Sequence, residues 1–148
     1  MAGPKQSIAS VIPSLRYRDA AKAIDWLCDA FGFERHLVVP GDDGAIAHAQ
    51  LQFGNGMLML GSGGGSGGAA ERIYDRLVQA PDDPESVRHG SLYAIVDDAD
   101  THCARARAAG AEIVEEPKDE DYGGRGYTCR DLEGHVWTFG TYDPLAED

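Results

Sequence analysis

The apolar and polar positions along the chain predict the same order of elements twice. An apolar, β-prone run from Ile8 to Tyr17 is followed by Asp19, a residue type that favours a helix N-cap. Apolar residues then recur at helical spacing as far as Phe31, and Gly32 predicts the end of that helix. Three further apolar runs, separated by short turns, predict strands at 35–40, 45–53 and 57–60.

The second half repeats this order at an offset of about 79 residues, since Asp98 aligns with Asp19 and run 136–139 with run 57–60. Residues 91–96 predict a strand, Asp98 begins a helix, and Gly110 ends it. Strands are expected at 111–117, 125–130 and 136–139, the last two forming a hairpin around Asp131 to Gly134. Each such unit has one apolar sheet face to cover, which predicts an α+β protein with two tandem βαβββ modules.

We place these modules at 7–61 and 91–142 of a single domain, 1–148. A Gly-rich linker with a short helix is expected at 62–90, and a tail at 143–148. The linker contains Gly63, Gly65 and Gly68 in the spacing of a dinucleotide-binding turn. That turn belongs between the first strand and first helix of a parallel unit, whereas these glycines follow a fourth strand. Residues 61–68 are all glycine or serine, a composition with too much conformational freedom to hold one anion-binding shape. We expect helical turns that pack down at Ile73, Tyr74, Leu77 and Val78.

Composition and charge limit the classes of partner. The chain has 148 residues, of which 43% are hydrophobic and 26% charged, and no segment resembles a membrane span or a signal peptide, so we expect a cytoplasmic protein. A formal net charge of −12 argues against nucleic acid as a partner. This acidity is typical of solubility, and it also favours cationic ligands. The three cysteines are far apart, so we expect buried or free thiols at Cys28, Cys103 and Cys129.

The two modules, together with the segment from Tyr122 to Tyr142, resemble the vicinal oxygen chelate superfamily. Its members include glyoxalase I, extradiol dioxygenases, fosfomycin-resistance transferases and bleomycin-binding proteins. The resemblance runs from about Ile8 to Tyr142 and implies curved mixed sheets around a cleft, the glyoxalase/bleomycin-resistance fold. The residues that look like the last hairpin of small members of this family are Arg130, Asp131, Glu133, Gly134, His135, Trp137, Phe139 and Gly140.

The resemblance also implies where a divalent metal would be bound. Metal enzymes of the family place one ligand on the first and last strand of each module, which here means Ile12, Met59, Ser91 and Thr138. None of these is a histidine or carboxylate, the donors that such a metal prefers. We therefore expect no metal at the usual site and no cofactor.

Strand alternation predicts which side chains line the cleft. In residues 45–53 the apolar set of Ala47, Ala49, Leu51 and Phe53 should face the helices, so that the intervening polar residues face the cleft. The alignment with the family places the core at Leu58, Leu60, Leu92, Val96, Trp137 and Phe139. The predicted ligand-binding residues are His48, Gln50, Met57, Met59, Ser91, Tyr93, Thr128 and Thr138.

Several of these residues also have an ordinary structural interpretation. His48 is either a general base, a ligand donor or one member of a nonstandard metal site, or a hydrogen-bonded structural histidine. Met57 and Met59 suit both an apolar ligand and a core. His135 is expected to bond locally in the hairpin. Arg125 and Arg130 are expected to pair with acidic residues, although carboxylate binding is an alternative. Acidic residues that we interpret as a helix cap are Asp97, Asp98 and Asp100. No role is assigned to His36, His89 or His102.

Three functions remain open from the sequence. The first is a protein that binds a small organic molecule, cationic or aromatic, without the usual metal. The second is a metal-dependent lyase, isomerase or dioxygenase with a displaced metal site that uses His48. The third is a scaffold whose cleft is filled by its own side chains. Because the edges of such sheets should be covered, we also expect a homodimer, and no catalytic residue is assigned.

Overall fold

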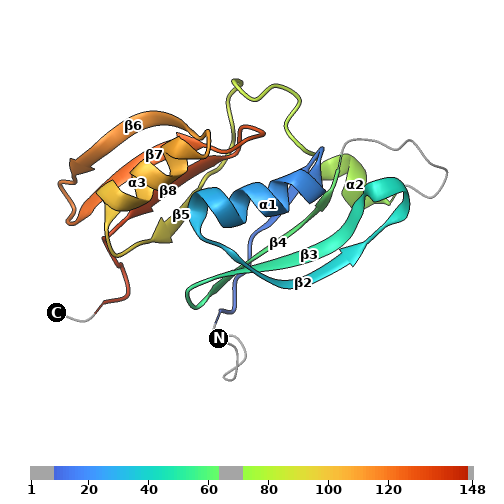
Figure 1. The fold of residues 1–148 in the computed structure, drawn as a ribbon, viewed down its shortest axis with the longest axis horizontal. Coiled ribbons are helices and arrows are strands. Elements are labelled where there is room, and N and C mark those ends of the chain that lie inside the picture. The colour runs from blue at the N-terminus through green and yellow to red at the C-terminus, as the bar shows by residue number, and fades with distance from the viewer. Residues whose placement is uncertain (1–8, 64–71, 147–148) are drawn as a thin grey trace. The chain divides into compact units, whose positions relative to one another are not determined.

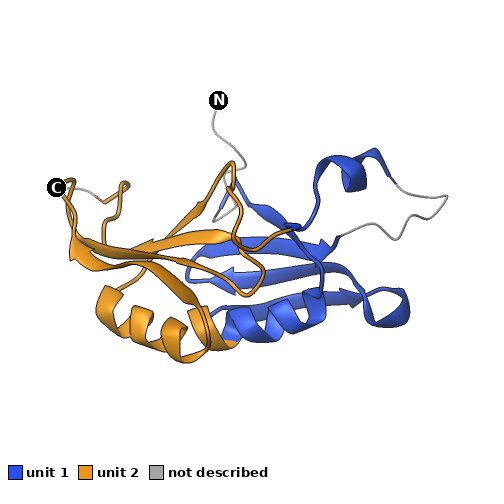
Figure 2. Cartoon of the chain, turned by 90° about the horizontal axis from the view of Figure 1, so that it is seen from above, with its two compact units in different colours: residues 1–28, 32–82 blue, residues 29–31, 83–148 orange. Residues whose placement is uncertain are grey.

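The computed structural model describes residues 9–63 and 72–146. These form two compact units, residues 1–28 with 32–82 and residues 29–31 with 83–148, coloured separately in Figure 2. The last turn of the first helix therefore belongs to the second unit. No helix in the described ranges combines the length and apolar character needed to cross a membrane.

The first unit is a four-stranded mixed sheet with one main helix (Figure 1). Its strands lie in the order β1-β4-β3-β2, with β1 parallel to β4 and the other neighbours antiparallel. A short 3-10 turn, Asp42–Gly44, joins β2 to β3. The elements are β1 (Ser14–Tyr17), α1 (Ala20–Phe31), β2 (Glu34–Pro40), β3 (Ile46–Phe53) and β4 (Gly56–Ser62).

The second unit repeats this topology in the order β5-β8-β7-β6, with β5 parallel to β8. The predicted fold class, α+β with two tandem βαβββ modules, is confirmed. A short helix, α2 (Ile73–Leu77), precedes this unit in the chain. Its own elements are β5 (Leu92–Ile95), α3 (Ala99–Ala108), β6 (Glu112–Asp119), β7 (Arg125–Arg130) and β8 (Val136–Gly140).

The two main helices begin where the sequence predicts. The Asp19 carboxylate accepts a hydrogen bond from the Lys22 backbone at 3.1 Å, and Asp98 accepts one from the Thr101 backbone at 3.1 Å. Each side chain thereby satisfies a backbone N–H of the first helical turn that has no partner within the helix. Gly32 ends α1 in the left-handed conformation, with φ of 90°, which glycine adopts without steric cost.

The first strand is shorter than predicted. The sequence predicts a strand from Ile8, which lies outside the described residues, whereas β1 begins at Ser14. Pro13 has no N–H for a sheet ladder, and its only part in the ladder is to accept the Met59 N–H at 3.0 Å. The preceding Val11 is 89% exposed. Pairing with β4 therefore stops at the proline.

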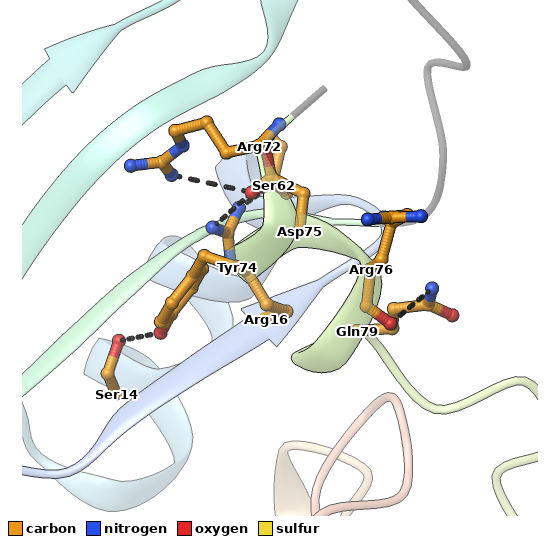
Figure 3. Close-up of polar contacts among 8 residues, drawn as sticks. All are labelled: Ser14, Arg16, Ser62, Arg72, Tyr74, Asp75, Arg76 and Gln79. Carbon is orange, nitrogen blue, oxygen red and sulfur yellow. Dashed lines mark hydrogen bonds and ion pairs between the residues drawn. The ribbon is translucent and has the colours of Figure 1, made fainter. Parts of the chain in front are cut away.

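The prediction that α2 packs down through apolar residues is wrong. Ile73 is 66% exposed and Leu77 is 78% exposed, so this helix of five residues buries little apolar surface. Polar contacts hold it on β1 instead (Figure 3). The Arg16 guanidinium donates to Asp75 and to the Ser62 carbonyl, both at 2.7 Å, and the Tyr74 hydroxyl donates to Ser14 at 3.4 Å.

Two cationic side chains lie close to the Tyr74 ring. The guanidinium carbon of Arg16 is 4.9 Å from the ring centroid and that of Arg72 is 5.5 Å away. Arg72 also bonds to Asp75, and this hydrogen bond is the main reason why the pKa of Asp75 is lowered. The surroundings of Tyr74 are therefore basic, in a chain that is acidic as a whole.

Candidate functional site

Each sheet has one face that carries the buried core and a second face, which we call the non-core face. In β3, Ala49 and Leu51 are fully buried, whereas His48 and Gln50 on the opposite side are only partly buried. In β4, Leu58 and Leu60 are buried and Met57 and Met59 are not. In β8, Trp137 and Phe139 are buried and Thr138 is partly exposed. The alternation that separates core from non-core residues is therefore confirmed for these strands.

The prediction fails at the start of β3, where Ala47 is exposed and Ile46 is buried. The register with β2 shifts here, since Val39 pairs with His48 but Pro40 pairs with Ile46. This two-against-one pairing is a β-bulge, which turns the preceding side chains by one position. From His48 onward, the strand follows the predicted alternation.

In the first unit, the candidate residues form a row across three strands. Met59 is in register with Ser14 of β1 on one side and with Gln50 of β3 on the other. Side chains directly opposite one another on neighbouring strands are close enough to contact a common ligand. The Gln50 amide nitrogen lies 3.1 Å from Nε2 of His48, so these two polar groups are already paired. Met57 lies two residues from Met59 on the same face, opposite Gln52.

In the second unit, the corresponding row is Tyr93, Thr138 and Thr128. The two threonine hydroxyls lie 2.8 Å apart and share one hydrogen bond. The Tyr93 hydroxyl donates to the Tyr142 carbonyl at 2.6 Å. Partial burial is the main cause that raises the pKa of Tyr93 above its ordinary value. All three side chains are neutral groups with hydrogen-bonding capacity.

Ser91 does not belong to this row. It precedes β5 and is exposed. The residues in register with Met59 and Thr138 are Ser14 and Tyr93, each two positions beyond the Ile12 and Ser91 of the family alignment. Residues two positions apart on a strand point to the same face, so alternation alone does not show which of them lies beside Met59. For this reason the sequence did not identify Ser14 as a candidate residue.

Groups with metal-binding chemistry are scattered. Within residues 9–63 and 72–146, no three or more His, Cys, Asp or Glu side chains gather in a way that would hold a metal ion. All three cysteines are free thiols, and burial raises the pKa of Cys129 to about 12. That thiol is protonated at neutral pH and is a poor nucleophile.

The hairpin motif between β7 and β8 has a structural explanation. Asp131 is only 6% exposed, and its carboxylate accepts three hydrogen bonds at 3.0 Å. The donors are the backbone N–H groups of Glu133 and His135 and the indole N–H of Trp137. Gly134 has a φ of 97°, and a Cβ there would lie 2.5 Å from the Pro84 carbonyl. The motif thus locks a turn and orients the core tryptophan.

The two arginines of β7 form ion pairs, as the ordinary interpretation predicts. Arg125 pairs with Asp100 at 2.9 Å and with Asp119 at 3.3 Å. Arg130 pairs with Glu112 at 3.1 Å. All three pairs are partly exposed, so they contribute modestly to stability and orient the side chains rather than forming a carboxylate-binding site.

His102, to which the sequence assigns no role, has a structural role. Its Nε2 lies 2.8 Å from the Phe31 carbonyl, and its Nδ1 lies 2.5 Å from the Tyr127 hydroxyl. A carbonyl only accepts, so Nε2 carries the hydrogen and Nδ1 accepts from Tyr127. Burial is the main cause that lowers the pKa of His102. It is a neutral, partly buried structural histidine.

Two further tyrosines lie near Tyr93 and were not assigned from the sequence. The Tyr122 and Tyr142 rings meet edge to face, with centroids 5.1 Å apart. Tyr142 supplies the carbonyl that binds the Tyr93 hydroxyl, and the charge-bearing group of Tyr122 is near enough to affect the pKa of Tyr93. Both residues follow strand ends, where periodicity carries no signal, although the glycines after Tyr122 indicate a close turn.

Comparison with known proteins identifies the class to which this fold and motif belong. The sequence matches the Glyoxalase/Bleomycin resistance protein/Dioxygenase superfamily over residues 7–139. The chain belongs to this superfamily, which confirms the resemblance seen in the sequence.

Similar proteins come from several bacteria. An uncharacterised protein of Mycobacterium bovis is 30% identical over 140 residues, covering 91% of this chain and 83% of that protein. The crystal structure of TioX from Micromonospora sp. ML1 is 32% identical with a TM-score of 0.66, covering 95% of this chain and all of that one. A mutant of the fosfomycin resistance protein FosX from Listeria monocytogenes, solved with Mn(II), shares the fold at 14% identity, with a TM-score of 0.61 and coverage of 92% and 90%.

Proposed function

We propose that this protein binds a small organic molecule on the non-core faces of its sheets, without the divalent metal that metalloenzymes of the superfamily use. The observation that carries this proposal is the row of Tyr93, Thr138 and Thr128, in which a tyrosine and two threonines stand side by side across three strands. Small ligands are bound by apolar surface with a few placed polar groups, and this row supplies both.

The non-core face of the first unit supports the same chemistry. Met59 and Met57 offer flexible, polarizable side chains that adapt to an apolar ligand. Gln50 and His48 add an amide and an imidazole beside them. Ser14, in register with Met59, offers a hydroxyl. Tyr93, in register with Thr138, does the same in the second unit. These side chains suit a neutral or cationic molecule, bound through apolar contact and hydrogen bonds. We propose that this binding takes place in the cytoplasm.

The alternative function is a metal-dependent lyase, isomerase or dioxygenase with a displaced metal site. The observation that favours it is His48, an imidazole on the non-core face next to Gln50. Imidazole is a common ligand for zinc, iron, nickel and manganese enzymes. In this case His48 would be a metal ligand, and further donors would have to come from outside its immediate neighbours.

Analysis of one sample decides between these functions. The chain is purified without chelator, its divalent metals are quantified, and the same sample is examined by native mass spectrometry before and after denaturation. We expect an organic compound that is released on denaturation and far less than one divalent ion per chain. Near-stoichiometric nickel, zinc, iron or manganese would overturn the proposal in favour of the enzyme, and a chain that holds neither would favour a scaffold.

We also propose that two copies of the chain associate. The edge strand β2 is exposed along its whole length, including Leu37, Val38 and Val39. The equivalent edge strand of the second unit, β6, carries charged residues and Pro117, which protect it from pairing with another strand. A second copy that covers β2 would remove this exposed apolar edge. Light scattering at micromolar concentration should give the mass of a dimer, and the mass of a single chain would contradict the proposal.

A further inference from the structure

Three of the six tyrosines of the chain are exposed together at one end of the second sheet. Tyr93 is 42% exposed, Tyr122 is 56% exposed and Tyr142 is 36% exposed. They come from three separate segments: β5, the turn between β6 and β7, and the segment after β8. Exposed aromatic side chains are ordinary one at a time, whereas a cluster of them forms a surface suited to binding.

Glycines allow two of these tyrosines to lie close against the backbone. Gly126 and Gly140 are in register on β7 and β8, so the sheet has no side chains at this point. A Cβ on Gly140 would lie 2.7 Å from the Tyr93 hydroxyl oxygen, which means that the Tyr93 ring lies over bare backbone. A Cβ on Gly124 would lie 2.7 Å from the Tyr142 nitrogen, so the close approach of Tyr142 also depends on glycine.

The charges near the cluster are acidic. Asp121 and Asp143 are exposed and adjacent in sequence to Tyr122 and Tyr142, and Asp143 acts on Tyr93 closely enough to raise its pKa. One cationic residue, Lys118 of β6, is in register with Gly126. Its ammonium group lies 3.9 Å from the Glu115 carboxylate, which offsets its charge. Arg125 is bound to Asp100 and Asp119. A ligand at the tyrosines would therefore meet negative potential.

We propose that Tyr93, Tyr122 and Tyr142 form a binding site for a planar aromatic cation. The electron-rich faces of tyrosine rings attract cations, and flat rings stack on them over a large area. Gly126 adds no side chain beside the tyrosines, and the Thr128 and Thr138 hydroxyls lie further along the same two strands. This inference rests on the proposed function, because it assigns the ligand class of the non-core face in the second unit.

Tyr74 provides an internal contrast. It is 40% exposed, similar to Tyr93 and Tyr142, but the guanidinium groups of Arg16 and Arg72 lie against its ring. A cationic ring would have to displace or oppose these charges. Tyr74 is therefore expected not to bind such a ligand, and its substitution provides a control of the same residue type.

The test uses the full chain labelled with 3-fluorotyrosine, so that ¹⁹F NMR reports on every tyrosine. The probes are 9-aminoacridine, which is flat and positively charged, anthracene-9-carboxylate, which has the same shape and a negative charge, and choline, a cation without a flat ring. We expect saturable shifts at Tyr93, Tyr122 and Tyr142 with 9-aminoacridine, much weaker binding of the other two probes, and no shift at the buried Tyr17 and Tyr127 or at Tyr74.

Variants locate the binding energy. Tyr122→Leu should raise the dissociation constant for 9-aminoacridine about tenfold, whereas Tyr122→Phe, which keeps the ring, should change it less than about twofold. Tyr74→Leu should leave it unchanged.

Equal binding of anthracene-9-carboxylate, or the absence of a saturable shift at the three tyrosines, would overturn this inference. Neither result would overturn the proposed function, which is decided by the metal content and the compound released from the purified chain. Conversely, a metal-loaded chain that still binds 9-aminoacridine at the tyrosines would overturn the proposed function and leave this site standing.

Discussion

The two halves of the molecule have the same topology but distribute their core volume differently between helix and sheet. In the first unit, α1 buries Ile24 and Leu27, and the strands contribute leucines such as Leu58 and one aromatic residue, Tyr17. In the second unit, α3 buries only small residues, and the strands contribute large aromatic ones. The small residues are Ala99, Cys103 and Ala106, and the aromatic ones are Tyr127, Trp137 and Phe139. One backbone arrangement therefore accepts either solution, as long as the total volume fills the space between the layers.

The difference extends to polar groups in the core. At the position of Ala23 in α1, which is fully buried, α3 has His102, which bonds to Tyr127 and to the Phe31 carbonyl. Trp137 bonds to Asp131, whereas its counterpart Leu58 has no polar atom. The second core therefore has hydrogen-bonded side chains at two positions where the first has the apolar Ala23 and Leu58. Those bonds make its stability more sensitive to substitution and to pH.

The largest effect is expected for Trp137→Ala. This change removes a large buried side chain and also leaves the Asp131 carboxylate without its indole donor, so the free energy of unfolding should fall by about 3–5 kcal/mol. The matched change Leu58→Ala creates a smaller cavity and breaks no hydrogen bond, so its loss should be smaller, at about 2–3 kcal/mol. Urea denaturation followed by circular dichroism measures both. A larger loss for Leu58→Ala would contradict the comparison.

The next effect concerns His102. His102→Leu removes the acceptor for the buried Tyr127 hydroxyl and should cost about 2 kcal/mol at neutral pH. Because the pKa of His102 in the folded chain lies below its ordinary value of 6.5, the unfolded chain takes up the proton first as pH falls. The stability that His102 contributes is therefore present above pH 6.5 and is lost as pH drops below it.

Denaturation curves collected from about pH 7.5 to about pH 5 test this prediction. The original chain should lose stability over this range, and His102→Leu should lose less over the same range. His89→Leu, which changes an exposed histidine in the same unit, is the control and should keep the original slope. An unchanged slope in His102→Leu would show that its titration does not contribute.

A smaller effect is expected on the non-core face of the second unit. Thr138→Val and Thr128→Val each remove one partner of the same hydrogen bond, so each should lower the free energy of unfolding by about 1 kcal/mol. The double substitution should cost less than the sum of the two, because both single changes break one shared bond. Met59→Leu, at the corresponding position of the first unit, conserves volume and should cost less. Strict additivity of the two threonine changes would contradict the shared bond.

The smallest effect is local. Asp75→Asn weakens the ion pair with Arg16 that holds α2 on β1, so the backbone amides of Asp75 and Val78 should exchange with solvent faster. Global stability should remain unchanged. Asp82→Asn removes an exposed partner of Arg18 and is the matched control. Exchange in α2 that is equally fast in both variants would show that the Arg16 pair does not hold this helix.

The parts of the fold that sequence predicts well are those set by local chemistry. Asp19, Asp98 and Gly32 mark helix ends because caps need particular side chains or a positive φ, and these signals were read correctly. The core residues of β4 and β8 follow from alternation once the alignment with the family fixes which face is buried. The hairpin around Asp131 was recognisable as a motif, and its hydrogen bonds explain why those residue types occur there.

The parts that sequence did not predict depend on contacts between distant segments. The burial of His102 requires Phe31 and Tyr127, which come from other elements. The apolar spacing of α2 predicts that Ile73 and Leu77 are buried, but both are exposed. An ion pair between Asp75 and Arg16 of β1 holds this helix instead. The cluster of Tyr93, Tyr122 and Tyr142 joins a strand and two irregular segments. The register that places Ser14 beside Met59 was not predicted, because parallel pairing has no turn that fixes its register.

We propose that the non-core faces bind through neutral side chains and not through a metal. Met57 and Met59 report on it directly, since both lie on the non-core face of the first unit, Met59 diagonally across from His48 and Met57 two residues further along β4. The chain is labelled with ¹³C-methyl methionine, the signals are assigned with Met→Leu variants, and one equivalent of Mn(II) is added. We predict that the Met57 and Met59 methyl signals keep their linewidths. Selective broadening of both signals at one equivalent, abolished by His48→Ala, would overturn this proposal and establish a metal site on this face.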